Sequence, residues 1–148
     1  GAGMCKWGWL CWQPVLAYGA DPYLAKGLGA RPAGLSSSGE EPSSKEHPCA
    51  KPLKVWSWFL ERGTVERGQL VLDPFLGSGT TLVACEQLGR FCAALEIVPA
   101  YVDVVIRRWQ HLTGQSATLE GSGQTFAQIE EERIGNKADD EGEGAPGP

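Results

Sequence analysis

Apolar positions between residues 69 and 111 alternate between short continuous runs and helical spacing. Residues 70–72 and 91–97 form two apolar runs of strand length. Apolar side chains also recur at helical spacing in two further segments. The first ends at Gly89 and carries Leu82, Val83 and Leu88, and the second begins at Pro99 and carries Tyr101, Val104, Val105 and Trp109. This order of strand, helix, strand and helix predicts an α/β fold in which a right-handed crossover joins two parallel strands.

The pattern is less regular on either side of this segment. Part of the aromatic and apolar segment 7–18 is predicted to be a strand, and residues 19–46, rich in Gly, Pro and Ser, are predicted to form a long surface loop. Pro52 offers a helix start, because the N–H that it lacks is not needed in the first turn. Apolar residues then follow at helical spacing as far as Gly63. Beyond Gly114 the chain is polar and acidic, and we expect disorder there.

Charge is distributed unevenly along the chain. The formal net charge is -5, but eight acidic residues lie beyond residue 119 with only Arg133 and Lys137 to balance them. The body is therefore near neutral, and its charge neither supports nor excludes a nucleic-acid partner. The five cysteines include no C-x-x-C pair, which argues against a metal site or a disulfide framework and favours a cytoplasmic setting. The sequence shows no apolar run of membrane-spanning length and no signal-peptide pattern.

A glycine-rich loop follows the first predicted strand. Residues 73–81 read Asp-Pro-Phe-Leu-Gly-Ser-Gly-Thr-Thr, and the glycines let the backbone approach a ligand at the carboxyl end of the strand. A phosphate-binding loop would have Lys directly after Gly79, where this chain has Thr80. A dinucleotide fingerprint would have a small residue at Leu82. The carboxylate of Asp73 disfavours an anionic pyrophosphate and favours a ligand with an ammonium or sulfonium group.

S-adenosylmethionine carries both of these positive groups, together with a ribose whose hydroxyls need an acceptor. Glu96 lies near the end of the second apolar run, 23 positions after Asp73. This is close to the spacing of roughly 20 residues that separates such a loop from a ribose-binding acid. The alternative is that Gly77 to Gly79 forms only a tight turn and that Glu96 is a solvated strand end.

Three segments together resemble the DNA amino-methyltransferases that modify adenine or cytosine in bacteria and their phages. Residues 73–81 are similar to the cofactor motif of that family, residues 96–101 to its E-x-x-P-x-Y signature, and residues 47–52, His-Pro-Cys-Ala-Lys-Pro, to its H-P-x-x-K-P motif. Cys49 and Ala50 stand where the family often has larger polar residues. The resemblance implies that S-adenosylmethionine is bound by the matching residues, which are Asp73, Pro74, Phe75, Gly77, Ser78, Gly79 and Thr80 around the cofactor, Glu96 at the ribose, and Lys51 and His47 near the methionine end.

The motif order implies a permuted member of the family, in which the catalytic D/N/S-P-P-Y/F/W motif comes first in the chain. The nearest match is Asp21-Pro22-Tyr23, which lacks one proline and lies only 24 residues before His47. We interpret it as a chance similarity. The chain begins Gly-Ala-Gly-Met, and we expect the upstream catalytic half to be absent from it.

The fold expected is therefore a partial Rossmann-like methyltransferase domain of the α/β class. Residues 1–46 would supply a partial strand and a long loop, residues 47–113 the S-adenosylmethionine-binding core, and residues 114–148 a disordered acidic tail. The resemblance implies direct methyl transfer to an exocyclic amino group in double-stranded DNA, on adenine in preference to cytosine, as in restriction-modification. Two alternatives remain: a noncatalytic cofactor-binding module that completes a separate catalytic half, and an inert fragment.

Overall fold

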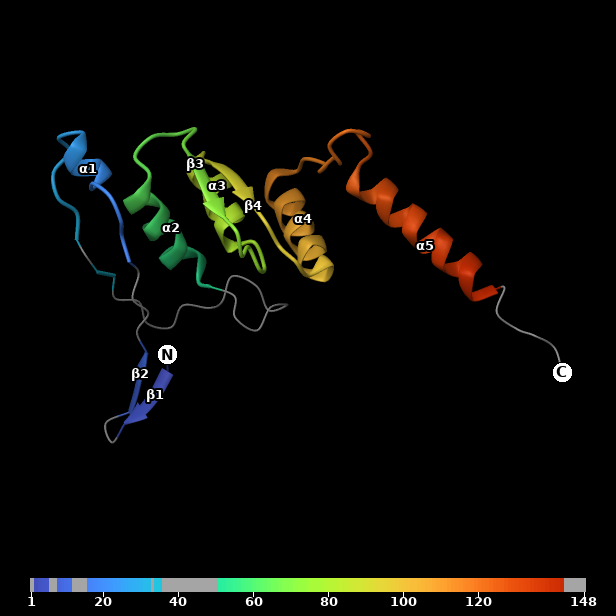
Figure 1. The fold of residues 1–148 in the computed structure, drawn as a ribbon, viewed down its shortest axis with the longest axis horizontal. Helices are drawn as coiled ribbons and strands as arrows, with labels where there is room; N and C mark the ends of the chain where they lie inside the picture. The colour runs from blue at the N-terminus through green and yellow to red at the C-terminus, as the bar shows by residue number, and fades with distance from the viewer. Residues whose placement is uncertain (1, 6–7, 12–15, 33, 36–50, 143–148) are drawn as a thin grey trace. The chain divides into compact units, whose positions relative to one another are not determined.

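The computed structural model describes residues 2–5, 8–11, 16–32, 34–35 and 51–142 (Figure 1). The chain divides into two compact units, Gly1–Arg31 and Pro32–Pro148, and each is considered separately. The predicted site residue His47 lies outside the described residues. No helix in the described part of the chain combines the length and the apolar character that crossing a membrane requires.

The described residues of the first unit form a strand pair and one short helix. Strands β1 (Ala2–Cys5) and β2 (Gly8–Cys11) are antiparallel, and β2 lies within the segment 7–18 where a strand is predicted. Helix α1 (Pro22–Ala25) interrupts the loop predicted over residues 19–46. The helix forms because the Asp21 carboxylate accepts hydrogen bonds from the amides of Tyr23 and Leu24, while Pro22 is suited to the first turn.

The second unit is built on one parallel strand pair. Strand β3 (Leu70–Asp73) pairs with β4 (Phe91–Ala94), and α3 (Thr80–Leu88) connects them, as the apolar pattern predicts. The second strand is shorter than the apolar run 91–97. Pairing ends at Asp73 opposite Ala94, because Pro74 has no N–H with which to continue the ladder.

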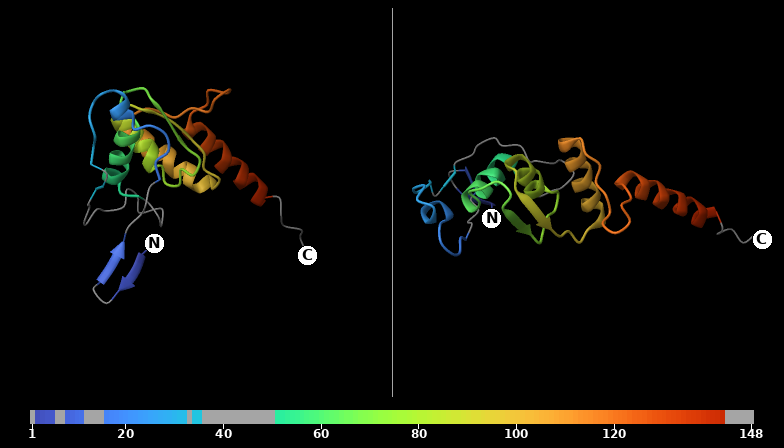
Figure 2. Two further views of the ribbon diagram at one scale, coloured as in Figure 1. Left: turned by 60° about the vertical axis from the view of Figure 1, so that its left-hand side comes forward. Right: turned by 90° about the horizontal axis from the view of Figure 1, so that it is seen from above.

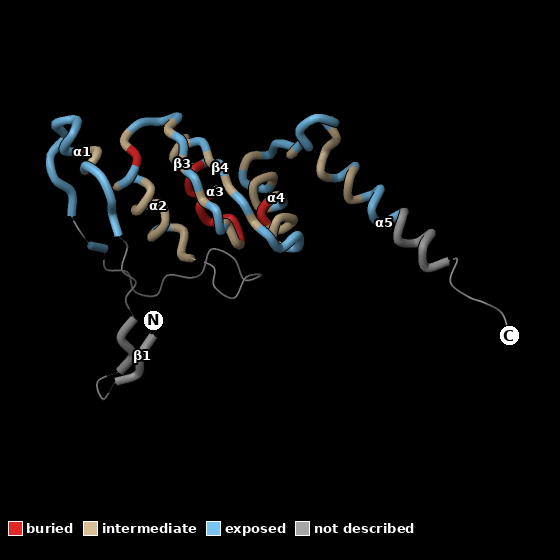
Figure 3. The backbone as a smooth tube through the Cα atoms, viewed as in Figure 1, coloured by how far each residue is buried: buried red, intermediate tan, exposed pale blue. Residues whose placement is uncertain are grey.

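Two further helices pack beside α3. Helix α2 (Leu53–Gly63) begins after Pro52 as predicted, and α4 (Pro99–Thr113) ends at Gly114 in the left-handed conformation. Both contact α3, whose buried residues form most of the core together with Val105 of α4 (Figure 3). In the views of Figures 1 and 2, α2, α3 and α4 lie on one side of the two strands.

The structure differs from prediction after Gly114, where helix α5 (Phe126–Gly142) forms in place of disorder. Thr125 and Gln128 explain its start. The Gln128 amide donates to the Thr125 hydroxyl at 3.3 Å, and the Thr125 amide donates to the Gln128 side chain at 2.8 Å, which is a reciprocal capping box. Arg107 of α4 holds this turn in place, because it pairs with Glu130 at 2.6 Å and its guanidinium lies over the Phe126 ring.

Candidate functional site

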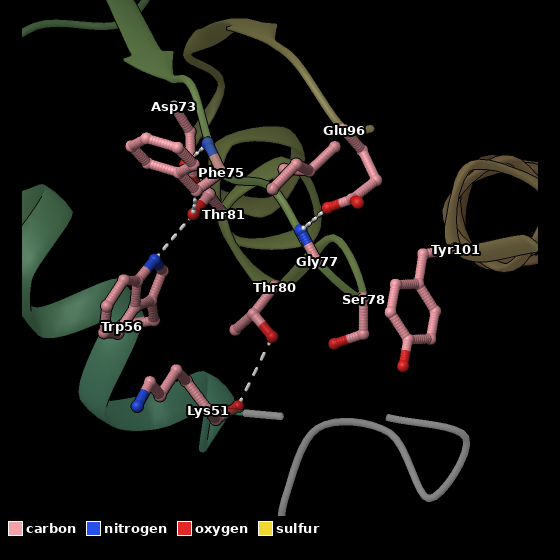
Figure 4. A pocket seen from close by; sticks show the side chains of 11 residues that line it. Lys51, Trp56, Asp73, Phe75, Gly77, Ser78, Thr80, Thr81, Glu96 and Tyr101 are labelled. Carbon is pink, nitrogen blue, oxygen red and sulfur yellow. Dashed lines mark hydrogen bonds between the residues drawn. The ribbon is translucent and has the colours of Figure 1, made fainter. Parts of the chain in front are cut away.

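A hollow of about 460 Å³ lies at the carboxyl ends of the two parallel strands (Figure 4). Its walls come from the start of α2, the loop between β3 and α3, and the segment that joins β4 to α4. The lining residues are Lys51, Trp56, Asp73, Phe75, Leu76, Gly77, Ser78, Thr80, Thr81, Glu96 and Tyr101.

Glycine is required at two turns of the loop between β3 and α3. Gly77 and Gly79 have φ values of 57° and 81°, in the left-handed region that side chains disfavour. Gly79 also lies directly against α4, since a Cβ atom there would be 2.9 Å from Cγ2 of Val105. The second glycine therefore serves helix packing as well as the turn.

The Asp73 carboxylate is held by groups on both sides of the loop. Its Oδ1 accepts from the Phe75 amide at 3.0 Å, and its Oδ2 accepts from the Thr81 hydroxyl at 2.5 Å. The Thr81 hydroxyl in turn accepts from the indole Nε1 of Trp56 at 2.6 Å. The end of β3, the first turn of α3 and helix α2 are therefore connected by side chains that line the hollow.

The Glu96 carboxylate connects the same loop to the end of the neighbouring strand. Its Oε2 accepts from the Gly77 amide at 2.7 Å, and its Oε1 accepts from the Val98 amide at 2.8 Å. A backbone hydrogen bond joins the same two segments, because the Leu76 amide donates to the Leu95 carbonyl at 2.9 Å. Two acids separated by 23 positions in sequence thus lie at one hollow.

Most of the residues predicted from the sequence line this hollow, namely Lys51, Asp73, Phe75, Gly77, Ser78, Thr80 and Glu96. Pro74 and Gly79 belong to the loop but are not among the lining residues. Lys51 contributes through its backbone as well, because its carbonyl accepts from the Thr80 hydroxyl at 3.4 Å. The Phe75 ring is 88% exposed, so it lies at the rim of the hollow.

Three polar or aromatic lining residues are absent from the predicted set: Trp56, Thr81 and Tyr101. Tyr101 ends the segment 96–101 that resembles the family signature, so a signal for it exists in the sequence. Trp56 reaches the site only because α2 packs against α3. Its helical spacing marks it as apolar but does not show where the indole N–H points.

The segment Asp21-Pro22-Tyr23 uses its polar groups within its own unit. Asp21 caps α1, and Tyr23 is 7% exposed with the Arg31 guanidinium 4.2 Å from the centre of its ring. An aromatic ring that stacks on a base must present a free face. The Tyr23 ring is largely covered.

Cys85 of α3 and Cys92 of β4 form a pair of free thiols beneath the sheet. A hydrogen bond from the Cys85 thiol lowers the pKa of Cys92, whereas this bond and burial raise the pKa of Cys85. Within the described residues, no group of three or more His, Cys, Asp or Glu side chains is arranged to hold a metal ion.

Comparison with known families identifies the family of the chain. Residues 20–107, more than half of the sequence, match the family described as DNA methylase (N6_N4_Mtase). The chain belongs to this DNA methylase family. The matched range includes Asp73, Glu96 and the whole loop between β3 and α3, so the residues that line the hollow lie within the part of the chain that matches the family. Its described core is of the mixed α/β class and is built on a parallel strand pair.

Two relatives illustrate how much of such a protein is present. The chain is 49% identical over 43 residues to the type II methyltransferase M.Cfr9I of Citrobacter freundii, covering 29% of this chain and 14% of the relative. It is 36% identical over 75 residues to the type II methyltransferase M.ScaI of Streptomyces caespitosus, covering 49% and 24%. The chain thus spans about a quarter or less of these relatives.

Solved structures show a comparable partial match. The M1.HpyAVI–SAM complex is 28% identical, with a TM-score of 0.43, and the match covers 53% of this chain and 41% of that one. The putative DNA modification methylase TTHA0409 from Thermus thermophilus, complexed with S-adenosyl-L-methionine, is 31% identical, with a TM-score of 0.39 and coverage of 50% and 27%.

Proposed function

We propose that the hollow binds S-adenosylmethionine and that the chain is the cofactor-binding part of a DNA amino-methyltransferase. The observation that carries the proposal is the placement of two carboxylates, Asp73 and Glu96, around a glycine-rich loop without a phosphate-binding Lys. Two acids favour a cationic ligand over a phosphate. The volume of about 460 Å³ also lies within the range of small-molecule sites, roughly 300–1,000 Å³.

The residues present suit the two ends of this cofactor. The Glu96 carboxylate accepts from the Gly77 and Val98 amides and lines the hollow, where the ribose hydroxyls would donate to it. Asp73 would face the cationic methionine end. Lys51 and the start of α2 would face the cofactor's carboxylate, because a helix N-terminus is electropositive.

Bound S-adenosylmethionine would supply an activated methyl group on its sulfonium. The chain's residues would hold and orient the cofactor for direct displacement by an exocyclic amino group, without a covalent enzyme intermediate. We propose a base in double-stranded DNA as the acceptor, adenine in preference to cytosine, and a duplex target requires base extrusion. A cytoplasmic location is part of this proposal.

Calorimetry on the full chain tests the cofactor proposal directly. We expect heat of binding for S-adenosylmethionine at millimolar concentration or below, and none for ATP, whose phosphates would meet the two acids. Absence of S-adenosylmethionine binding at millimolar concentration would contradict the proposal and favour an inert fragment.

A second candidate function is that of a noncatalytic module that binds the cofactor for a separate catalytic half. The outer face of the β3–β4 sheet favours it. Four large apolar side chains on or next to these strands are 67–70% exposed: Leu70, Leu72, Phe91 and Leu95, the last of which follows β4. The register places Leu70 beside Phe91. Parallel sheets are normally covered on both faces. A polypeptide carrying the remaining part of a type II methyltransferase would cover this face, since the chain spans about a quarter or less of such relatives.

Methyl transfer separates the two candidates. Activity of the chain alone on duplex DNA would show that no second half is needed. Activity only after adding the remaining part of a relative such as M.ScaI would support the module. In that case Phe91→Ser should reduce the restored activity while cofactor binding persists, and Ile134→Ser, a control at an exposed residue of α5, should leave it unchanged.

A further inference from the structure

Trp56 is linked to Asp73 by two successive hydrogen bonds that pass through the Thr81 hydroxyl. The indole Nε1 donates to the Thr81 hydroxyl at 2.6 Å, and the Thr81 hydroxyl donates to Oδ2 of Asp73 at 2.5 Å (Figure 4). The three residues come from α2, α3 and β3. All three line the hollow.

The indole determines which group donates and which accepts in these two hydrogen bonds. A threonine hydroxyl near a helix start can rotate and can donate to a backbone carbonyl instead of a side chain. The indole N–H is a donor only, so its bond to Thr81 occupies an acceptor site of the hydroxyl and leaves the hydroxyl proton for Asp73. Thr81 is 4% exposed, so its hydroxyl has little access to alternative partners in solvent.

The result is a carboxylate with a fixed orientation. Oδ2 is held by Thr81 and Oδ1 by the Phe75 amide, one donor on each oxygen. An ionised carboxylate has about four acceptor sites. Two acceptor sites therefore remain on a carboxylate that lines the hollow and is fixed in orientation.

We propose that Trp56 is a positioning residue for the cationic end of the cofactor and acts through Thr81 on Asp73. This inference rests on the proposed function, because it assigns a role within the S-adenosylmethionine site. Trp56 also packs edge-on against Phe59, with ring centres 5.9 Å apart. Phenylalanine at position 56 would keep an aromatic ring for that contact, so only the N–H distinguishes positioning from packing.

Two ligands separate the ends of the cofactor in calorimetry on the full chain. S-adenosylhomocysteine has the adenosine and the amino-acid end, whereas 5′-methylthioadenosine has the adenosine without the ammonium. We expect Trp56→Phe to weaken S-adenosylhomocysteine binding about fivefold to tenfold, the order expected for one hydrogen bond. Binding of 5′-methylthioadenosine should change less than about twofold, since a lost bond at the other end leaves its contacts intact.

Thr81 tests the same connection independently, so the result does not depend on Trp56→Phe folding. Thr81→Val should weaken S-adenosylhomocysteine binding selectively, while Thr81→Ser, which keeps the hydroxyl, should restore it. Once the hydroxyl is absent, adding Trp56→Phe should have no further effect on affinity. Trp58→Phe is the matched control, because Trp58 lies on the same helix but is not among the lining residues.

The outcomes are distinguishable. Additive effects of Trp56→Phe and Thr81→Val, or equal losses for both ligands, would overturn the positioning role and leave Trp56 as a packing residue. Loss of affinity in Trp58→Phe equal to that in Trp56→Phe would also overturn it. If the wild-type chain bound neither ligand, the proposed function would fail, and the positioning role would fail with it.

Discussion

Replacing Glu96 by alanine removes an acceptor from the Gly77 amide and from the Val98 amide. A hydrogen bond to a charged group contributes about 1.5–3 kcal/mol when well buried. Val98 is 40% exposed, so water can replace part of what is lost at its amide, and we take about 1 kcal/mol for each bond. The free energy of unfolding should then fall by about 2 kcal/mol, which lowers Tm by about 4–8 °C for a chain of this size.

Cofactor affinity should fall as well. The ribose hydroxyls would lose their charged acceptor, and we expect S-adenosylmethionine to bind more than about tenfold more weakly, which corresponds to about 1.4 kcal/mol or more. The fold should persist, because the Leu76 amide still donates to the Leu95 carbonyl and the parallel strands are untouched.

Calorimetry and thermal unfolding followed by circular dichroism measure the two effects separately. Glu86→Ala is the matched control. Glu86 is an exposed acid of α3 that accepts from the Trp109 indole at 3.0 Å, and it does not line the hollow. Glu86→Ala should leave the affinity for S-adenosylmethionine unchanged. If Glu96→Ala bound S-adenosylmethionine within about twofold of wild type, the assignment of Glu96 to the ribose would be wrong.

Three further predictions concern the loop and the core beneath it. Asp73→Ala should weaken S-adenosylmethionine binding more than about tenfold in calorimetry with the circular dichroism spectrum unchanged, since the cationic end loses its acid; normal binding would refute that role. Gly79→Ala combines a left-handed φ of 81° with a contact of 2.9 Å to Val105, and should lower the unfolding free energy in urea by about 2–4 kcal/mol. Adding Val105→Ala should recover only the part of that loss that comes from the contact with Val105. Full recovery of the unfolding free energy would show that the left-handed φ does not destabilise alanine at this position. Iodoacetamide should label Cys92 at lower pH than Cys85, because the pKa of Cys92 is lowered and that of Cys85 is raised; equal labelling by peptide mass spectrometry would contradict this order.

The parts of the fold that can be predicted from sequence are those set by local pattern. Two apolar runs separated by a helical face predict β3, α3 and β4, and Pro99 and Gly114 bound α4. The same pattern implies that Asp73 and Glu96 meet, because parallel pairing aligns the carboxyl ends of the two strands.

Two helices that prediction missed begin at capping side chains within polar sequence. Asp21 before Pro22 starts α1, and Thr125 with Gln128 starts α5. In each case the surrounding composition favours loop or disorder, while two or three hydrogen bonds decide the local conformation. Contact between Arg107 and Glu130 then anchors α5, and no local pattern shows that ion pair.

The hydrogen bond between Trp56 and Thr81 also escapes prediction, and the reason is different. It joins residues that are 25 positions apart, and it depends on how α2 rotates against α3. Helical spacing defines the apolar face of α2 but not the direction of one N–H within it. The sequence therefore indicates which acids form the site, while tertiary packing determines what orients them.

The acids of the hollow already bind the loop that would surround a ligand. Glu96 accepts from the Gly77 amide and Asp73 from the Phe75 amide, so the loop is held by side chains of the protein itself. A site preorganised in this way loses little conformational entropy on binding, so association should be fast and nearly free of a slow rearrangement step. The Gly77 amide should accordingly resist hydrogen exchange in the ligand-free protein, and its protection should rise only modestly when the ligand binds.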